Sequence, residues 1–422
     1  MSTDAAADFI GSFADFITAS PTSYHAVAQM AEQLRGAGFE QLDESQRWSQ
    51  VQGSQFVVRD GALIAWTIPE DADATSGFRI VGSHTDSPSF KLKPNPTSTT
   101  AGWQQAGMEV YGGPLNNSWL DRELGLAGRL VTLDGEVTLV RTGPIARIPQ
   151  LAPHLDRTVN DQLKLDRQQH LMPFYSLDPQ LDIEDYLCRA ARIDPSELAH
   201  HDVYAFPTEA PMVFGPDSEF FAASRMDNLS SVHASLQALL DVEVGHDVAV
   251  LAAFDHEEVG SATRSGACGP FLEDMLVRIA EGMGATGAAY RAMLARSSCL
   301  SADAGHAVHP NYVQMHDPNN HPQLNGGPLL KINANQRYAT DGIGAALWKR
   351  ACEQAEVPTQ PFVSNNAVPC GSTTGPLTAT RLGIITVDVG IPLLSMHSAR
   401  ELCGVEDPWY FSRALGAYWA GA

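Results

Sequence analysis

Apolar residues recur at helical spacing in the first part of the chain. The segments FADFITAS and SPTSYHAVAQMAEQLRGAGF both have this spacing, and Gly36 and Gly38 follow the end of the second. From Phe56 to His84 the pattern becomes that of strands, and it ends in the apolar run FRIVG directly before the polar SHTDSP. The sequence therefore predicts two opening helices, then strands, with His84 at the end of a buried strand.

The middle of the chain has a different pattern. Between about Lys93 and Asp217, Pro, Gly and Asn separate short β-type runs, and LVTLDGEVTLV is typical of a hairpin with Asp134 and Gly135 in its turn. We expect residues 93–217 to form a β-rich domain, inserted into a first domain made of residues 1–92 and 218–422.

After this insertion, apolar strands alternate with helices. The segment DNLSSVHASLQALLDV is predicted as a helix whose apolar face carries Leu229, Val232, Leu236, Leu239 and Leu240. DVAVLAAFDHEEVGS, CLSADAG and LGIITVDVGIPLLSMHS each run from an apolar strand into polar residues. This alternation predicts an α/β domain with a mostly parallel central sheet flanked by helices, and ligands bind at the carboxyl ends of the strands in such sheets.

Five side chains of metal-ligand type fall at predicted strand ends or at a helix start: His84, Asp227, Glu258, Asp303 and His397. Each alone is more typical of an ordinary polar position. Together, two imidazoles and three carboxylates suit zinc or another borderline divalent ion. Two metals about 3.5–4 Å apart need a shared carboxylate, and each needs a further carboxylate and a nitrogen donor. The five residues supply that count.

The segment DHEEVG narrows the kind of site. It has no second His four residues after the first, which excludes a thermolysin-like single-metal site. We expect Glu257 and Glu258 on extended backbone, where adjacent side chains point in opposite directions, so one can bind metal while the other reaches the attacking water. The residues alone do not decide which does which. Asp86 either accepts the second imidazole N–H of His84 or caps a turn, and both roles stay open.

Composition and charge limit the classes of function. The 422 residues are 44% hydrophobic, enough for the cores of two domains. The formal net charge of −22 repels phosphate backbones and anionic lipid surfaces, so we expect neither nucleic acid nor membrane as a partner. No C-x-x-C pair, no secretory signal pattern and no run of eighteen apolar residues is present. We therefore expect a cytoplasmic protein.

Seven segments in order along the chain resemble the aspartyl aminopeptidase family, dinuclear zinc metallopeptidases of the bacterial cytosolic type: SHTDSP, SRMDNL, DHEEVGS, SADAGHAVHPNY, KINANQRYAT, CGSTTGP and LSMHSARE. The resemblance implies an α/β catalytic domain interrupted by a β-rich dimerisation domain. It also implies a large homo-oligomer, usually a dodecamer. The implied substrates are peptides with a free N-terminus, from which single residues, Asp or Glu by preference, are released.

The resemblance further implies two zinc ions per subunit that share one carboxylate. The first would be held by His84, Asp227 and Asp303, and the second by Asp227, Glu258 and His397. Glu257 would be the general base that takes a proton from the water between the metals. The resulting hydroxide would attack the scissile carbonyl, and Glu257 would return the proton to the leaving amine. Mn²⁺ and Co²⁺ fit the same ligands.

Four further residues would contact the substrate by the same resemblance: His154, His306, Lys331 and Tyr338. His154 lies in the predicted insertion and would reach the active site of a neighbouring subunit; its alternative role is an additional metal ligand. The Lys331 ammonium would face the substrate carboxylate. One near pair in a desolvated pocket can outweigh the field of a strongly acidic protein, because distant charges are screened more.

Three alternative functions remain open at this point. A broad-specificity aminopeptidase would use the same metals without an acidic preference. A dinuclear zinc deacylase or amidohydrolase would use them on N-blocked amino acids, and the need for a free substrate α-amine separates it from an aminopeptidase. A non-catalytic scaffold would keep the assembly without the chemistry, although a scaffold needs neither the ligand set nor Glu257.

Overall fold

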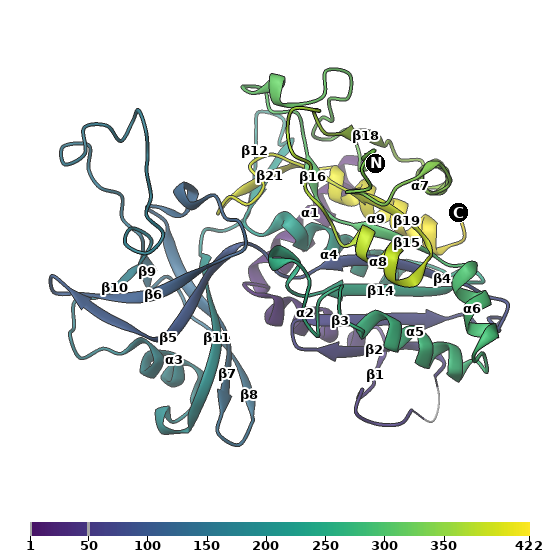
Figure 1. Ribbon diagram of the computed structural model, residues 1–422, viewed down its shortest axis with the longest axis horizontal. Coiled ribbons are helices and arrows are strands. Elements are labelled where there is room, and N and C mark those ends of the chain that lie inside the picture. The colour runs from purple at the N-terminus through teal and green to yellow at the C-terminus, as the bar shows by residue number, and fades with distance from the viewer. Residues whose placement is uncertain (1, 49–50) are drawn as a thin grey trace.

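The computed structural model describes residues 2–48 and 51–422, which form two parts (Figure 1). The larger part is built on a nine-stranded sheet with helices on both faces. In spatial order its strands are β1 (Glu40–Gln41), β2 (Gly53–Arg59), β3 (Ala62–Ile68), β14 (Val248–Phe254), β4 (Phe78–His84), β15 (Ser298–Ala302), β19 (Ile385–Gly390), β17 (Leu329–Ile332) and β18 (Gln360–Val363). Among these described strands, β14, β4, β15 and β19 are consecutive parallel neighbours. The predicted mostly parallel α/β sheet is confirmed.

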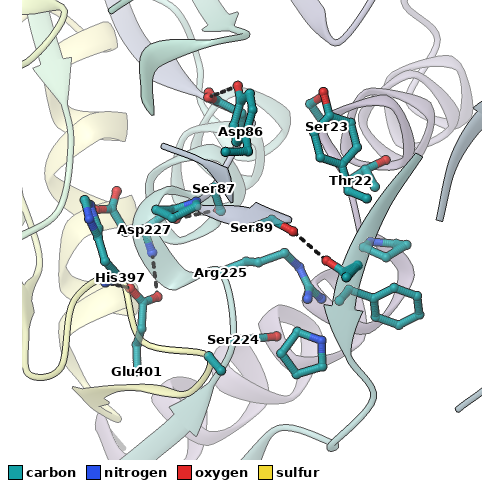
Figure 2. Close-up of a pocket in the computed structure, with 18 of the residues that line it drawn as sticks. Thr22, Ser23, Asp86, Ser87, Ser89, Ser224, Arg225, Asp227, His397 and Glu401 are labelled. Atoms are coloured by element: carbon teal, nitrogen blue, oxygen red, sulfur yellow. Dashed lines mark hydrogen bonds and ion pairs between the residues drawn. The ribbon is translucent and has the colours of Figure 1, made fainter. Parts of the chain in front are cut away.

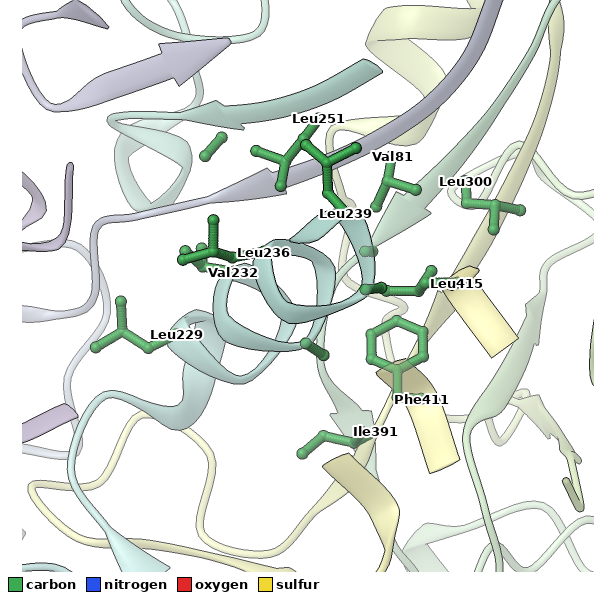
Figure 3. Packing of buried hydrophobic residues seen from close by; sticks show 14 of the residues in the cluster. Val81, Leu229, Val232, Leu236, Leu239, Leu251, Leu300, Ile391, Phe411 and Leu415 are labelled. Carbon is green, nitrogen blue, oxygen red and sulfur yellow. The ribbon is translucent and has the colours of Figure 1, made fainter. Parts of the chain in front are cut away.

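Both faces of the sheet are buried, which explains the continuous apolar runs in its central strands. All seven residues of β14, VAVLAAF, are buried. Successive side chains alternate between two cores: Leu251 and Val81 pack in one cluster, and Val250 and Ile80 pack in the other. Figure 3 shows the first cluster, where Leu236 and Leu239 of a central helix meet the sheet.

The helices divide between these two cores. One face is covered by α1 (Ser2–Ala19), α2 (Ser23–Gly36), α4 (Met226–Asp241), α7 (Gly342–Ala355) and α9 (Asp407–Trp419). The other is covered by α5 (Phe271–Gly282), α6 (Ala288–Ala295) and α8 (Gly375–Leu382). The two predicted opening helices are confirmed, and α1 begins earlier than the apolar pattern indicates. No helix in residues 2–48 and 51–422 combines the length and apolarity that crossing a membrane requires.

The second part is a closed β-barrel with one further strand at its side. Its strands are β5 (Ser89–Thr100), β6 (Trp103–Tyr111), β7 (Glu123–Thr132), β8 (Val137–Arg141), β9 (Ala146–Arg147), β10 (Phe174–Ser176) and β11 (Leu198–Pro207), and α3 (Ile183–Ala191) packs on their core. The barrel closes because β11 pairs with both β5 and β7. The predicted hairpin is confirmed, since β7 and β8 pair around a turn in which Gly135 has φ 88°.

Short strands lie where the chain returns from the barrel. β12 (Met212–Phe214) and β13 (Phe220–Ala223) form a sheet with β21 (Glu401–Gly404), and β16 (Gly305–His306) pairs with β20 (Pro392–Leu393). The inserted β-rich domain is thus confirmed as a fold feature. Its boundaries at 93 and 217 stay a prediction: the barrel strands run from Ser89 to Pro207, and β12 pairs with β13, which pairs with β21 of the larger part.

Candidate metal centre

The five candidate ligands converge at one edge of the central sheet. His84 is the last residue of β4, Asp303 follows β15, and Glu258 lies in the turn after β14. These three strands are parallel neighbours, and His84 pairs in register with Phe254, so their carboxyl ends meet. Asp227 lies at the start of α4, and its peptide bond to Asn228 is cis. His397 lies in the loop after β20.

The carboxylate of Asp227 separates the ligand atoms into two groups. Its Oδ1 lies 3.4 Å from Nε2 of His84, which is 3.6 Å from Oδ1 of Asp303. Its Oδ2 lies 3.5 Å from Nε2 of His397, which is 3.5 Å from Oε1 of Glu258. Within each group, all the ligand atoms lie within 4.8 Å of one another. One carboxylate therefore faces two separate sets of donors.

These separations fit metal ligation better than direct pairing. Two atoms bound at about 2.0–2.1 Å to one tetrahedral zinc ion lie about 3.3 Å apart. The buried Oδ1 of Asp227 has no hydrogen-bond partner among the described residues, which is costly for a carboxylate unless a cation meets it. The donor set of imidazole and carboxylate suits zinc. The residues present thus fit a metal centre.

The electrostatics of the site also favour a bound cation. Burial opposes protonation of His84, but its contacts with Asp227, Asp303 and Asp86 outweigh burial and hold its pKa well above the ordinary value. Burial likewise opposes protonation of His397, and Asp227 and Glu258 raise its pKa to about 10. A group of carboxylates that draws protons onto both imidazoles offers the same field to a divalent ion, which competes with those protons.

The turn that carries Glu257 and Glu258 corrects one expectation. We expected extended backbone with the two side chains in opposite directions, and this is wrong: residues Glu257–Val259 form a 3-10 turn. The strand stops at Phe254 because His256 and Gly260 adopt left-handed backbone on either side of that turn. Glu258 shares a ligand group with Asp227 and His397, whereas Glu257 joins only a group with His84 and Glu258. Burial raises the pKa of Glu257 to about 7.

Asp86 is buried beneath this turn and has several partners. The Nδ1 atom of His84 lies 3.1 Å from the Asp86 carbonyl oxygen and 3.3 Å from its carboxylate. The carboxylate also accepts hydrogen bonds from the backbone N–H groups of Glu257 at 3.0 Å and Glu258 at 3.1 Å. Asp86 therefore combines the two roles that the sequence left open: it contacts the imidazole, and it holds a turn.

Three supporting residues carried no recognisable functional signal in the sequence. The Tyr111 hydroxyl, at the end of barrel strand β6, donates to Asp86 at 2.7 Å. Nδ1 of His397 lies 3.0 Å from the Gly113 carbonyl oxygen. Glu401 accepts from the backbone N–H groups of Asp227 and His397. Asp86, Asp227, His397 and Glu401 line one pocket, which Figure 2 shows. Of the three supporting residues Tyr111, Gly113 and Glu401, only Glu401 lies inside a segment of the resemblance, where it had no assigned role.

The predicted substrate residues are placed unequally. Lys331 is 1% exposed, donates from Nζ to the Ala304 carbonyl oxygen at 2.7 Å, and lies 3.7 Å from Oδ2 of Asp303. Tyr338 lies under its ammonium, with 5.4 Å from Nζ to the ring centre. His306 is exposed in β16. Lys331 therefore lies beside the candidate ligand Asp303, Tyr338 lies beside Lys331, and His306 follows Asp303 by three residues.

His154 lies elsewhere. It is exposed, in the long loop between β9 and β10 of the barrel. It belongs to none of the ligand groups found among the described residues. Within one chain, the structure does not bring His154 together with the five candidate ligands.

Comparison with known proteins agrees with this geometry. The family described as Aminopeptidase I zinc metalloprotease (M18) matches residues 16–419. The chain belongs to this family. A Streptomyces coelicolor protein named probable M18 family aminopeptidase 2 is 50% identical over 412 residues, which cover 96% of this chain and 95% of the relative. A Pseudomonas paraeruginosa protein of the same name is 42% identical over 422 residues, with 97% of each chain covered.

Solved structures of related proteins have the same fold. A cryo-electron microscopy structure of the Ape4 and Nbr1 complex contains a chain with a TM-score of 0.94 and 36% identity, over 99% of this chain and 86% of that one. The structure of the S. cerevisiae mApe1 dodecamer has a TM-score of 0.87 and 29% identity, and the match covers 97% of this chain and 96% of the mApe1 chain. The M18 assignment makes the protein a metal-dependent aminopeptidase, a hydrolase that acts on peptide bonds.

Proposed function

We propose that this M18 aminopeptidase is a two-zinc enzyme that releases single N-terminal residues, Asp or Glu by preference, from peptides. The observation that carries the two-metal proposal is the Asp227 carboxylate, whose two oxygens face separate donor sets. His84 and Asp303 would complete the first site, and Glu258 and His397 the second. Bound zinc ions would lower the pKa of water and polarise the scissile carbonyl.

Glu257 is the proposed general base. Its carboxylate lies beside His84 and Glu258 but outside the two groups that share Asp227. Burial raises its pKa to about 7, near the range in which a base both accepts and returns a proton. Glu257 would take a proton from the attacking water and deliver it to the leaving amine nitrogen. Asp86 would hold Glu257 in place through the backbone of the turn.

Lys331 is the proposed source of acidic preference. An ammonium group has three N–H donors, and the described hydrogen bonds of Lys331 use one of them, toward Ala304. A second can meet the side-chain carboxylate of a substrate residue next to Asp303. In a site that is otherwise rich in carboxylates, one buried cation is the group that discriminates Asp and Glu from Leu.

We also propose self-association into a large homo-oligomer. The related mApe1 structure is a dodecamer. In such an assembly the barrel would provide the dimer contact, and His154 would reach a neighbouring subunit's substrate rather than a metal of its own chain. Its exposure and its position on a long barrel loop support this role. A cytoplasmic location stays a prediction from the sequence.

The deciding experiment compares kcat/KM for aminoacyl chromogenic substrates with Asp, Glu, Leu, Ala and N-acetyl-Asp groups. We expect Asp and Glu to exceed Leu by more than about tenfold, or about 1.4 kcal/mol. Lys331→Met should abolish that margin, and Lys349→Met, at an exposed helix position, is the matched control. A chelator should remove activity with every substrate, and Zn²⁺, Mn²⁺ or Co²⁺ should restore it.

The other outcomes are equally definite. Fastest turnover of Leu or Ala would leave a broad-specificity aminopeptidase and overturn the role of Lys331. N-acetyl-Asp as the best substrate would replace the aminopeptidase proposal with the deacylase. If the protein bound less than one zinc ion per chain and hydrolysed none of these substrates, the non-catalytic scaffold would replace the enzyme proposal.

A further inference from the structure

Two buried carboxylates outside the proposed ligand set hold the backbone of the metal centre. Asp86 accepts from the backbone N–H groups of Glu257 and Glu258. Glu401 does the same for two other residues: Oε1 accepts from His397 N–H at 2.8 Å, and Oε2 accepts from Asp227 N–H at 3.0 Å. Every ligand of the second proposed zinc site therefore has its backbone N–H bound by one of these two carboxylates.

Glu401 has no other described role that explains its burial. It is the first residue of β21, it is 2% exposed, and it belongs to none of the candidate ligand groups. Figure 2 shows it directly beside Asp227 and His397. Its hydrogen bonds are to these two backbone groups, and no Lys or Arg side chain pairs with it among the described residues. Burial of an acidic side chain is costly, and the two hydrogen bonds from the backbone of candidate ligands are the described contacts that offset this cost.

The two segments that Glu401 joins need such a support. His397 has left-handed backbone, with φ 66°, in the loop after β20. Asp227 lies in a non-helical first turn of α4, with φ −83° and ψ 102°. Neither segment has the regular hydrogen bonding that fixes residues inside a strand or helix, and the two are far apart in sequence. One carboxylate that binds both N–H groups sets the spacing between the bridging carboxylate and the second imidazole.

We propose that Glu401 is a positioning residue for the second metal site. This inference rests on the proposed two-zinc centre. Both proposed sites share Asp227, but the other two ligands of the first site, His84 and Asp303, have no hydrogen bond to Glu401. The second site also relies on His397, whose backbone N–H Glu401 binds. Loss of Glu401 should therefore weaken the second zinc more than the first. Zinc–ligand distances tolerate only about 0.2 Å, so a small shift of either segment is sufficient.

The test measures zinc binding rather than turnover. Metal-free protein is titrated with zinc against a chromophoric chelator, and the Co²⁺-loaded form gives a visible spectrum of each site. Glu401→Gln keeps the shape of the side chain, but its amide nitrogen cannot accept an N–H, so one of the two backbone groups loses its acceptor. Glu401→Asp, which is too short to reach both groups, is the second variant should the first fail to fold.

Asp407 offers a matched control. Its carboxylate is also fully buried and also accepts two backbone N–H groups, from Asn325 at 2.8 Å and Gly327 at 3.0 Å, but its described partners include no candidate ligand. Asp407→Asn therefore removes the same kind of contact at a distance from the metals. A loss of thermal stability common to both variants measures the structural effect, and the difference in zinc affinity measures positioning.

We expect Glu401→Gln to weaken the second zinc by at least about tenfold while the first changes by less than about threefold. Asp407→Asn should bind both as the wild type does. Unchanged zinc affinities in Glu401→Gln and Glu401→Asp, or equal weakening at both sites, would overturn the inference. If the wild-type protein still bound two zinc ions, the proposed function would stand. Wild-type protein with a single zinc would overturn the two-zinc centre and this inference with it.

Discussion

At the scale of single residues, two adjacent glutamates have different surroundings. Glu258 and Glu257 follow one another in a 3-10 turn, and Asp86 binds the backbone N–H of both. Only Glu258 lies within a ligand group that includes Asp227 and His397. The same turn thus directs one carboxylate to a proposed metal and the other to the proposed position of the attacking water.

This difference predicts opposite consequences for the two isosteric variants. Glu257→Gln should keep both zincs and lower kcat by about 10²–10⁴-fold, because the proton acceptor is lost. Glu258→Gln should lose zinc at the second site, because an amide is a poor zinc ligand. Metal analysis of dialysed protein and steady-state kinetics check both. Retention of two zincs by Glu258→Gln, together with loss from Glu257→Gln, would exchange the two roles.

At the scale of elements, the barrel is a structural support for the metal centre of its own chain. In addition to the contacts of Tyr111 and Gly113, the segment after β6 binds the loop that carries His397. Leu115 N–H donates to the His397 carbonyl oxygen, and the Ser118 hydroxyl accepts from Ala399 N–H. The inserted domain therefore fixes one proposed ligand in addition to any role in assembly.

A second element-scale feature is the contact between α1 and α4. His233 of α4 is 1% exposed and lies among Phe9, Phe13 and Phe16 of α1, with its Nε2 atom 3.1 Å from the Ser12 hydroxyl. Burial lowers the pKa of His233 to about 3. The imidazole is therefore neutral in the folded protein, and within residues 2–48 and 51–422 no carboxylate pairs with it to stabilise a proton.

The packing of these two helices predicts a pH dependence of stability. The unfolded chain binds a proton to this His near its ordinary pKa of 6.5, and the folded chain does not until about pH 3. Stability from His233 is therefore present above pH 6.5 and falls below it, by about 1.4 kcal/mol for each pH unit. Denaturant unfolding of His233→Leu between pH 5 and 8 should show a shallower dependence by that amount. His246→Leu, at an exposed position, should keep the wild-type slope; equal slopes in all three proteins would contradict the assignment.

At the scale of the whole molecule, the proposed active site would need a second chain to supply His154. The five candidate ligands and Glu257 come from the larger part, but His154 lies on an exposed loop at the barrel. Figure 1 shows this loop at the side of the barrel away from the central sheet. In the proposed oligomer, a neighbouring subunit would bring this loop to a second active site.

Assembly therefore predicts complementation between two chains that each lack one proposed site residue. In sedimentation at micromolar concentration, we expect a species close to twelve times the chain mass of 45.4 kDa. His154→Ala should lower kcat/KM without changing that species. Co-expressed Glu257→Gln and His154→Ala chains should recover about a quarter of wild-type activity, because a mixed pair joins an intact Glu257 with an intact His154. No recovery from a mixed assembly, or a monomer in sedimentation, would contradict the role of His154.

Periodicity and strand ends were sufficient to predict much of this fold. The opening helices, the α4 face, the hairpin at Gly135 and the position of His84 were all predicted, because each depends on residues close together in sequence. The sequence also named the five side chains that converge, since carboxyl ends of parallel strands meet at one edge of a sheet. Their roles as ligands stay a prediction.

Tertiary structure decided what depends on distant residues. The turn at Glu257 is 3-10 rather than extended because Asp86, far away in sequence, draws its backbone N–H groups together. Glu401 bridges two segments that no local pattern connects. Sequence by itself determined which elements form and which polar groups end them, because hydrophobic periodicity is local. The orientation of those groups was decided only when strands, turns and the barrel were packed together, since buried polar groups must find partners wherever the fold provides them.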